Sequence, residues 1–315
     1  LWPEEDFRAT GLDVPAGFAI RFGRAAVPEE AASACVGVDY IVTGSGFGYI
    51  SRDILDSAPA TRLVQLTGAG YENVDHDTCG ERGIPVCYCP GLNAPSVAQL
   101  VVQQTIKFLR PLTALETGGG EEWFAARKQS VMGHEFGGRV GIVGYGNIGR
   151  QTASLFQGLG FDVVRAAHRS QEEDAVPAVP FAALLGSADF VVVCLPARPD
   201  TRGLIGPEEV AQMKPGAVLV HVGRSGVVDD RAVAAALADG RLGGAIFDVF
   251  EKEPLAEDHP FLALPPEIRA RVLLTPHVGG QTRESKARNF RIALENVLRV
   301  EAGEAPLYPT PLSKA

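Results

Sequence analysis

The stretch Gly144-Tyr145-Gly146-Asn147-Ile148-Gly149 decides the fold class that we expect for this chain. It follows the apolar run Arg139–Val143, which is typical of a strand, and it opens a segment with helical spacing. In such a strand–turn–helix unit, glycines permit a tight turn, a close approach of the main chain to a pyrophosphate, and close packing of helix on strand. The helix N-terminus then presents unpaired N–H groups to the phosphates. A plain turn without a ligand is the alternative, but this context favours a dinucleotide site. The predicted cofactor contacts are Gly144, Gly146, Asn147, Ile148 and Gly149.

Short β-branched runs alternate with helical stretches around this turn, which is the pattern of a parallel sheet with crossover helices. The near-continuous apolar run at residues 189–195 is expected of a strand that is covered on both faces. We predict an α/β protein in which a doubly wound Rossmann sheet spans residues 102–274. This domain is inserted into a smaller, discontinuous α/β domain made of residues 1–101 and 275–315.

The residues after the second predicted strand bear on the choice of cofactor. NAD-binding units place Asp or Glu there to hold the ribose 2′-hydroxyl, whereas this chain has Ala167 followed by His168, Arg169 and Ser170. The guanidinium of Arg169 can pair with a 2′-phosphate, and Ser170 can donate a hydrogen bond to it. The alternative is that Arg169 is a solvated surface charge and that NAD is used. The loss of an acid and the gain of a cation favour NADP(H) over NAD(H), with His168 at the adenosine end.

Three charged residues follow later predicted strands, where open α/β sheets place their ligands: Arg224, Glu253 and His277. Hydride transfer to a keto acid leaves negative charge on the carbonyl oxygen, so a proton donor that titrates near neutral pH is needed, and His277 fits. Glu253 is the candidate that stabilises the imidazolium, and Arg224 can bind the substrate carboxylate and polarise the carbonyl. Each residue alone has an ordinary structural explanation. Their order after the glycine turn predicts a nicotinamide-dependent dehydrogenase.

The composition argues against several other functions. The net charge of −9 leaves no general basic surface for nucleic acid, and no apolar run approaches the ~20 residues of a membrane helix. The five cysteines and six histidines show no complete set of metal ligands by spacing, so no metal is predicted. Reduced thiols and the lack of a visible signal peptide lead us to expect a cytoplasmic protein.

In these residues the chain resembles the D-isomer-specific 2-hydroxyacid dehydrogenases. The ordered matches begin near Val38 and include the segments starting at Gly68, Pro90 and Ser96, together with Leu195-Pro196 and the three catalytic segments. The resemblance implies a flavodoxin-like domain beside the Rossmann domain, usually in a homodimer. It also implies hydride transfer between NADP(H) and a small 2-keto acid of the glyoxylate or hydroxypyruvate type.

The resemblance implies further site residues. Main-chain N–H groups of Ala69 and Gly70 would hold the substrate carboxylate together with Arg224 and His277, and Asp248 would lie near the nicotinamide. The remaining implied cofactor contacts are Leu195, Pro196, Thr201, Val222, Gly223 and Gly279.

Several residues depart from the usual family pattern, among them Gln99 where a Glu is common, and other functions are weighed against the one implied. Family members often have Asn where His221 stands and Gly where Ser225 stands. A corepressor-like sensor that binds the dinucleotide without turnover is the main alternative, and the intact Arg, Glu and His set argues against it. Formate-type members carry Gln where Glu253 stands, and phosphite-type members carry a Lys in the loop that matches Ala69-Gly70, so both fit less well.

Overall fold

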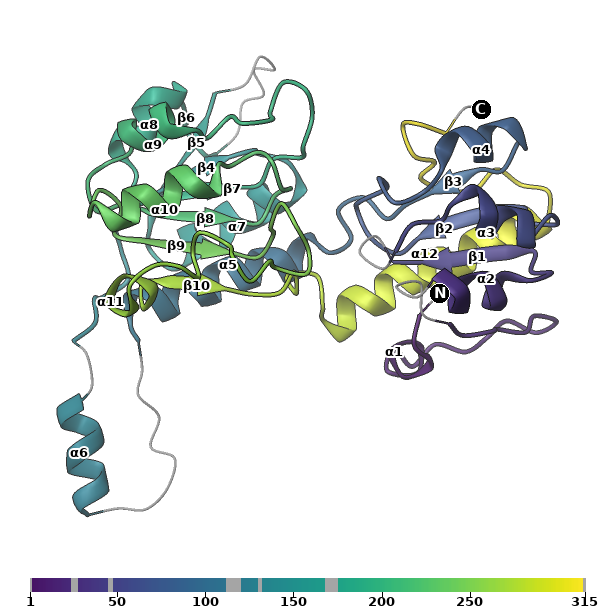
Figure 1. The fold of residues 1–315 in the computed structure, drawn as a ribbon, viewed down its shortest axis with the longest axis horizontal. Coiled ribbons are helices and arrows are strands. Elements are labelled where there is room, and N and C mark those ends of the chain that lie inside the picture. Colours follow the sequence, from purple (N-terminus) through teal and green to yellow (C-terminus); the bar gives the residue numbers. More distant parts are fainter. Residues whose placement is uncertain are drawn as a thin grey trace. The chain divides into compact units, whose positions relative to one another are not determined.

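The structure is a computed structural model that describes residues 2–23, 28–44, 48–111, 120–129, 132–167 and 175–313 (Figure 1). The chain divides into two compact units, Leu1–Asn93 with Gly280–Ala315 (unit 1) and Ala94–Gly279 (unit 2). These boundaries differ from the predicted 101/102 and 274/275. Helix α5 (Ala94–Leu109) lies wholly in unit 2 because its Val97 and Val101 share one apolar core with the central strand of that unit.

Unit 2 is built on a seven-stranded sheet in the order β10-β9-β8-β7-β4-β5-β6, with every neighbouring pair parallel. The chain proceeds from β4 to β6 in one direction and from β7 to β10 in the other, so the direction reverses between β4 and β7. This reversal is the switch point of a doubly wound sheet, and it confirms the predicted Rossmann-type fold. The strands are β4 (Arg139–Val143), β5 (Asp162–Ala166), β6 (Ala178–Val179), β7 (Phe190–Val193), β8 (Val218–His221), β9 (Gly244–Phe247) and β10 (Val272–Leu274).

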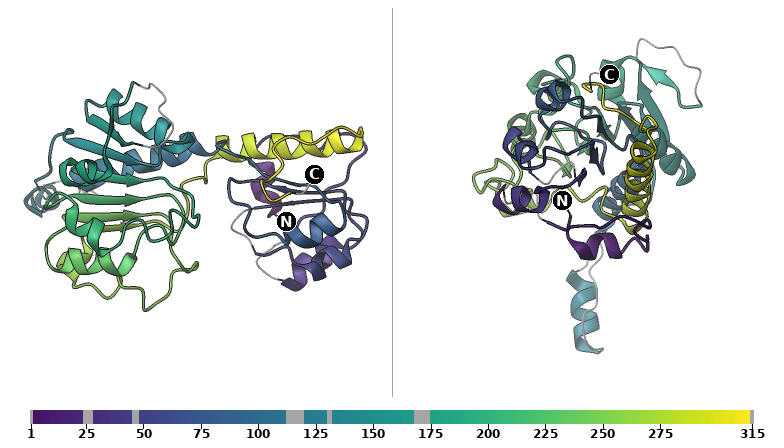
Figure 2. Two further views of the ribbon diagram at one scale, coloured as in Figure 1. Left: turned by 90° about the horizontal axis from the view of Figure 1, so that it is seen from above. Right: turned by 90° about the vertical axis from the view of Figure 1, so that its right-hand side faces the viewer.

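Both faces of this sheet are covered (Figure 2). Phe190 and Val192 of β7 join the core formed with α5 and α7, whereas Val191 and Val193 join the core formed with α8, α9 and α10. Side chains alternate between the two faces of a strand, so a strand that is buried on both sides needs a continuous apolar run. The helices of unit 2 other than α5 are α6 (Glu121–Gln129), α7 (Asn147–Gly158), α8 (Phe181–Ser187), α9 (Pro207–Gln212), α10 (Asp230–Ala238) and α11 (Pro266–Arg269).

Unit 1 has a parallel sheet of three strands, β1 (Tyr40–Thr43), β2 (Leu63–Leu66) and β3 (Val86–Cys87), in that order. Polar side chains fasten its long C-terminal helix to the sheet: Asn296 Nδ2 donates to Gln65 Oε1 at 2.6 Å, and both residues are fully buried. The helices of unit 1 are α1 (Glu4–Arg8), α2 (Pro28–Cys35), α3 (Arg52–Ser57), α4 (His76–Glu81) and α12 (Arg283–Glu301).

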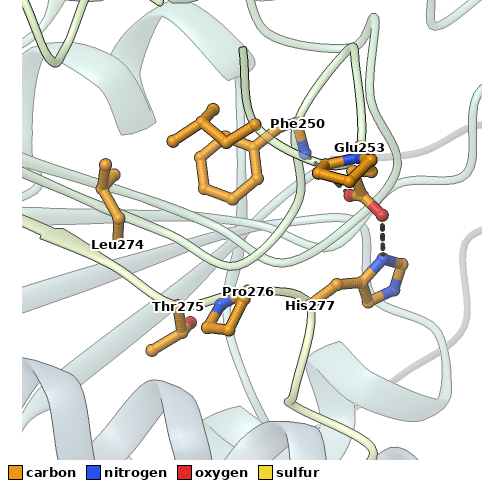
Figure 3. Close-up of a pocket in the computed structure, with 8 residues that line it drawn as sticks. Phe250, Glu253, Leu274, Thr275, Pro276 and His277 are labelled. Carbon is orange, nitrogen blue, oxygen red and sulfur yellow. Dashed lines mark hydrogen bonds and ion pairs between the residues drawn. The ribbon is translucent and has the colours of Figure 1, made fainter. Parts of the chain in front are cut away.

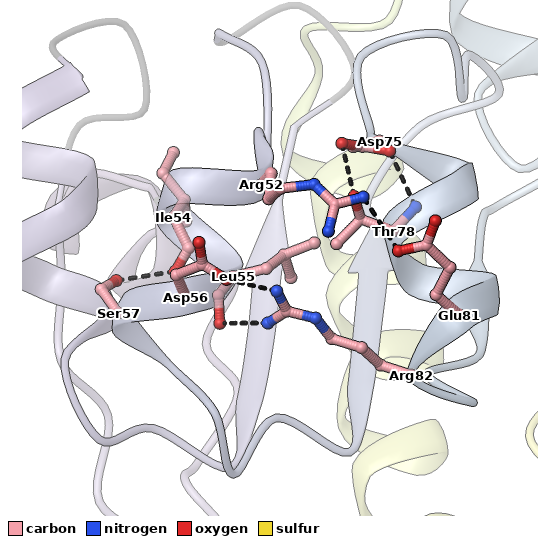
Figure 4. Close-up of polar contacts among 9 residues, drawn as sticks. All are labelled: Arg52, Ile54, Leu55, Asp56, Ser57, Asp75, Thr78, Glu81 and Arg82. Carbon is pink, nitrogen blue, oxygen red and sulfur yellow. Dashed lines mark hydrogen bonds and ion pairs between the residues drawn. The ribbon is translucent and has the colours of Figure 1, made fainter.

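Two surface ion pairs connect α3 with α4 and the residue that follows it (Figure 4). Arg52 Nη2 lies 2.9 Å from Glu81 Oε2, and Arg82 pairs with Asp56 while its Nη1 donates to the Leu55 carbonyl at 2.9 Å. Exposed pairs of this kind contribute little to stability, so the buried apolar core of unit 1 carries most of it. In the described part of the chain, no helix is long and apolar enough to cross a membrane.

Candidate active site

A histidine–carboxylate pair lies in the loops after β9 and β10 of unit 2 (Figure 3). His277 Nδ1 is 2.8 Å from Glu253 Oε2, and the Phe250 N–H donates to the other carboxylate oxygen, Oε1, at 3.0 Å. A carboxylate at Nδ1 favours a proton on that nitrogen. Nε2 is then the nitrogen that can exchange a proton with a substrate.

The electrostatic surroundings keep Glu253 ionised. Burial disfavours the carboxylate, but the hydrogen bonds from His277 and from Phe250 N–H, together with the positive charge of Arg224, outweigh burial. The pKa of Glu253 therefore lies below its ordinary value. Arg224 is half-buried after β8, where its Nη1 donates to the Gly223 carbonyl at 3.1 Å. Unit 2 thus places the three predicted catalytic residues within electrostatic reach of one another.

Asp248 holds the chain around His277 through the side chain of Thr275 before it and the main chain of Val278 and Gly279 after it. Its carboxylate is 3% exposed, with Oδ1 accepting from Thr275 Oγ1 at 2.6 Å and from Val278 N at 2.9 Å. Oδ2 accepts from Gly279 N at 2.8 Å, and a Cβ on Gly279 would come within 2.8 Å of the same oxygen. Burial raises the pKa of Asp248 against the opposing effect of these hydrogen bonds.

The hydrogen bonds of Asp248 hold a strained residue in place. His277 has φ 53°, a left-handed conformation that costs a non-glycine residue roughly 1–2 kcal/mol. Its own N–H donates to the Thr275 carbonyl at 2.9 Å. Strain that the surroundings impose on one residue often marks a functional position.

A cavity of about 240 Å³ adjoins the histidine–carboxylate pair of His277 and Glu253. Its wall is mostly apolar, with Glu253 and His277 at one side (Figure 3). The lining residues are Phe250, Glu253, Pro254, Leu255, Leu274, Thr275, Pro276 and His277.

The glycine turn has the geometry that a dinucleotide requires. A Cβ on Gly149 would lie 2.2 Å from the Gly144 carbonyl oxygen, and Gly144 has φ 101°, so neither position admits another residue without a shift. A Cβ on Gly146, in contrast, would meet nothing within 4 Å. Gly146 is the N-cap residue of α7, and it has no side chain that could accept a hydrogen bond from the first N–H groups of the helix. The N-terminus of α7, with Asn147 and Ile148, therefore opens onto free space that fits a pyrophosphate.

The other implied cofactor residues of unit 2 meet at the carboxyl ends of β7 and β8. A Cβ on Gly223 would lie 2.4 Å from the Leu195 carbonyl oxygen, so the main chain at Gly223 passes directly against Leu195. Thr201 Oγ1 donates to the Pro196 carbonyl at 2.6 Å and accepts from Arg198 N at 2.8 Å. These residues are distant in sequence, and the contacts bring them together beside the switch point between β4 and β7.

The geometry of unit 2 does not test two sets of predicted residues. His168, Arg169 and Ser170 lie outside the described residues. Ala69 and Gly70 follow β2 in unit 1, where Ala69 is half-buried and Gly70 is buried. Their role in holding the substrate stays a prediction.

Sequence reasoning missed several residues that support the site. The Thr275 hydroxyl donates to Asp248, and the Phe250 N–H donates to Glu253. The guanidinium carbons of Arg150 and Arg165 lie 4.8 and 5.1 Å from the ring centroid of Tyr145 in the glycine turn. Arg165 comes from β5, so no local spacing signals that contact.

Comparisons with known proteins identify the family of this chain. The family model for the NAD binding domain of D-isomer specific 2-hydroxyacid dehydrogenases matches residues 103–279. The chain is 38% identical over 258 residues to (S)-sulfolactate dehydrogenase of Chromohalobacter salexigens, which covers 79% of this chain and 81% of that protein. It is 32% identical over 277 residues to glyoxylate/hydroxypyruvate reductase B of Pectobacterium carotovorum subsp. carotovorum, covering 84% and 82%.

The fold has similar solved relatives. The structure of 2-hydroxyacid dehydrogenase from Ketogulonicigenium vulgare Y25 superposes with a TM-score of 0.74 at 30% identity, covering 91% of this chain and 89% of that one. With the Rossmann sheet, the glycine turn and the histidine–carboxylate pair, these matches show that the chain belongs to the D-isomer specific 2-hydroxyacid dehydrogenases, dinucleotide-dependent oxidoreductases that act on the CH–OH group of their donors.

Proposed function

We propose that this enzyme reduces a small 2-keto acid to the D-2-hydroxy acid, with NADPH preferred over NADH. The observation that carries the proposal is the 2.8 Å contact between His277 Nδ1 and Glu253 Oε2, with the charge of Arg224 acting on the same carboxylate. NADPH supplies the hydride when it is bound at the glycine turn. The work of the protein is to bind the acid, orient its carbonyl and provide the proton.

Each catalytic residue has a separate task in this proposal. His277 donates its Nε2 proton to the carbonyl oxygen as negative charge develops there, and Glu253 stabilises the imidazolium and its orientation. Arg224 binds the substrate carboxylate and polarises the carbonyl. The N–H groups of Ala69 and Gly70 are proposed to bind the same carboxylate. Neither donates to another group among the described residues, which supports this role.

The preference for NADPH rests on the end of β5. Ala167 follows this strand, and its N–H donates to the Val179 carbonyl at 2.8 Å. Because its side chain is a methyl group, this position offers no carboxylate for a ribose 2′-hydroxyl. The sequence places His168, Arg169 and Ser170 next, and we propose that they contact the 2′-phosphate. We also propose a homodimer, on the basis of the family resemblance, and a cytoplasmic location, on the basis of the free thiols.

The substrate has two candidates. Glyoxylate and hydroxypyruvate are the first, on the name of the Pectobacterium relative. A sulfonated 2-hydroxy acid is the second candidate, because the Chromohalobacter relative named (S)-sulfolactate dehydrogenase has 38% identity.

The deciding experiment measures initial rates of NADPH and NADH oxidation with glyoxylate, hydroxypyruvate, pyruvate, 3-sulfopyruvate and phenylpyruvate. Turnover with NADPH preferred supports the proposal and ranks the substrates. Turnover with NADH preferred would keep the chemistry and refute the role of Arg169. Tight NADP(H) binding without turnover on any acid would indicate a dinucleotide sensor instead.

We expect Arg224→Ala to lower kcat/KM by about 10²- to 10³-fold or more, because the developing charge loses its fixed cation. Steady-state kinetics with the best keto acid check this expectation. Arg231→Ala, which removes an exposed arginine of α10, is the matched control and should leave the rate unchanged. An Arg224→Ala protein with a near-normal kcat/KM would contradict the assignment.

The assignment of Arg169 predicts a change in cofactor affinity alone. Arg169→Ala should raise the KM for NADPH by about tenfold, the value of one lost charge-assisted contact, with little change in kcat. The KM for NADH serves as the internal control, since NADH lacks the 2′-phosphate. Equal increases in both KM values would argue against a phosphate contact.

A further inference from the structure

A polar pair is buried beside the loop that carries Glu253. His259 Nε2 lies 3.0 Å from Asp230 Oδ2, and the two side chains are only 10% and 15% exposed. The Phe261 N–H donates to His259 Nδ1 at 3.4 Å, so Nε2 carries the proton that is donated to Asp230. Asp230 is itself fixed as the first residue of α10, directly after the N-cap Asp229. Nε2 of His259 is therefore held by a residue of α10, and Nδ1 is held by Phe261 of the loop that contains His259.

The ring of His259 supports Phe250. The two rings meet edge to face with centroids 5.7 Å apart and an interplanar angle of 86°, and Phe250 is 5% exposed. His259 also lies 5.1 Å from Phe261, whose ring is 4.8 Å from that of Phe247 at the end of β9. Phe250 is thus packed between a fixed imidazole and the apolar core, and its N–H is the group that donates to Glu253 Oε1.

The loop has few other means of fixing this carboxylate. Residues 248–265 form neither helix nor strand, so side-chain contacts decide where Glu253 lies. A buried, hydrogen-bonded polar pair is weak evidence for stability, since apolar residues of similar volume are often equally stable in its place. The contribution of this pair is better explained by the geometry that it imposes on the loop.

We propose that Asp230 and His259 are positioning residues for the catalytic carboxylate: the pair fixes the imidazole against Phe250, and the Phe250 main chain aims Glu253 at His277. The inference rests on the proposed function, because it assigns Glu253 the role of partner to the proton donor. Misplacement of a catalytic group by about 1 Å can cost on the order of 10²-fold in rate.

The test compares four variants of the full-length enzyme. His259→Leu and Asp230→Asn should lower kcat by about 10- to 100-fold while changing the KM for NADPH by less than about twofold. His259→Gln keeps an N–H donor for Asp230 and should recover most of kcat. Asp189→Asn is the matched control, because it breaks another polar pair of unit 2, with Lys214 Nζ at 2.6 Å, at the amino ends of the strands. It should lower the melting temperature and leave kcat unchanged.

A second measurement does not depend on turnover. Amide hydrogen exchange of Phe250, followed by NMR, reports the bond to Glu253 directly, and we expect about tenfold faster exchange in His259→Leu and Asp230→Asn but not in Asp189→Asn. Should His259→Leu fail to fold, the nearly isosteric Asp230→Asn decides both measurements. Normal kcat with normal Phe250 exchange in a folded variant would overturn the inference, as would an equal loss of kcat in the control. An inactive wild type would refute the proposed function, whereas the exchange data would still decide the positioning role.

Discussion

At the scale of single residues, His221 makes the stability of the fold depend on pH. It is 1% exposed, its ring meets Phe247 edge to face at 5.4 Å, and neither ring nitrogen has a hydrogen bond of good geometry among the described residues. Burial lowers its pKa to about 4, against a smaller opposing effect from the main chain of Val193 and Arg224. The unfolded chain takes up this proton near pH 6.5, whereas the folded protein does so only near 4. Stability is therefore lost as pH falls through this window.

We expect this loss to reach about 3 kcal/mol for the wild type between pH 6.5 and 4, and His221→Phe to remove that part of the pH dependence. Urea denaturation of both proteins at several pH values in this range measures the difference. Parallel curves for wild type and variant would show that His221 does not titrate as inferred.

At the scale of elements, two glycines of the turn between β4 and α7 have different roles: Gly149 is needed for the fold and Gly146 for cofactor binding. Gly149→Ala places a methyl group against the Gly144 carbonyl, so α7 must move, and overpacking of this kind costs about 1–3 kcal/mol. Gly146→Ala meets no atom within 4 Å and has an ordinary φ of −91°, so the fold tolerates it. Its methyl group would occupy the space that the pyrophosphate needs.

We therefore expect Gly146→Ala to keep the melting temperature within about 2 °C and to weaken NADPH binding by at least about tenfold. Gly149→Ala should lower the melting temperature clearly. Thermal unfolding and fluorescence titration with NADPH distinguish the two effects. A Gly146→Ala protein that binds NADPH normally would place the pyrophosphate elsewhere.

At the scale of the whole molecule, unit 2 is continuous in sequence and carries both of its own apolar cores, the glycine turn and the His277–Glu253 pair. Residues 94–279 expressed alone should therefore fold and bind NADPH within about threefold of the full chain, since a domain with its own core can fold independently. This fragment should show no turnover, because it lacks Ala69 and Gly70. Fluorescence titration and a rate assay check both statements, and keto-acid reduction by the fragment would remove these two residues from the mechanism.

Much of the architecture could be predicted because long apolar strands leave a strong local signal. The predicted strand at 139–143 has the observed bounds, and the apolar run at 189–195 contains β7. Strand β6 was missed because Ala178–Val179 is too short to show a period, and α6 was missed because Glu121–Gln129 has no apolar stripe at helical spacing. The domain boundary at Ala94 could not be read either, since it depends on what α5 packs against.

What the sequence by itself determined is the fold class and the glycine turn, and it predicted the catalytic side chains, because strand–turn–helix periodicity and residue chemistry are local properties. The sequence proposed the pairing of Glu253 with His277, and the tertiary structure decided its geometry, with Oε2 at Nδ1. Only the tertiary structure decided that Asp248 bonds Thr275, Val278 and Gly279 around His277 and that the ring of His259 packs against Phe250. These contacts belong to loops without regular hydrogen bonding. Their geometry follows from which side chains the sheet brings to its carboxyl edge, and no spacing along the chain encodes it.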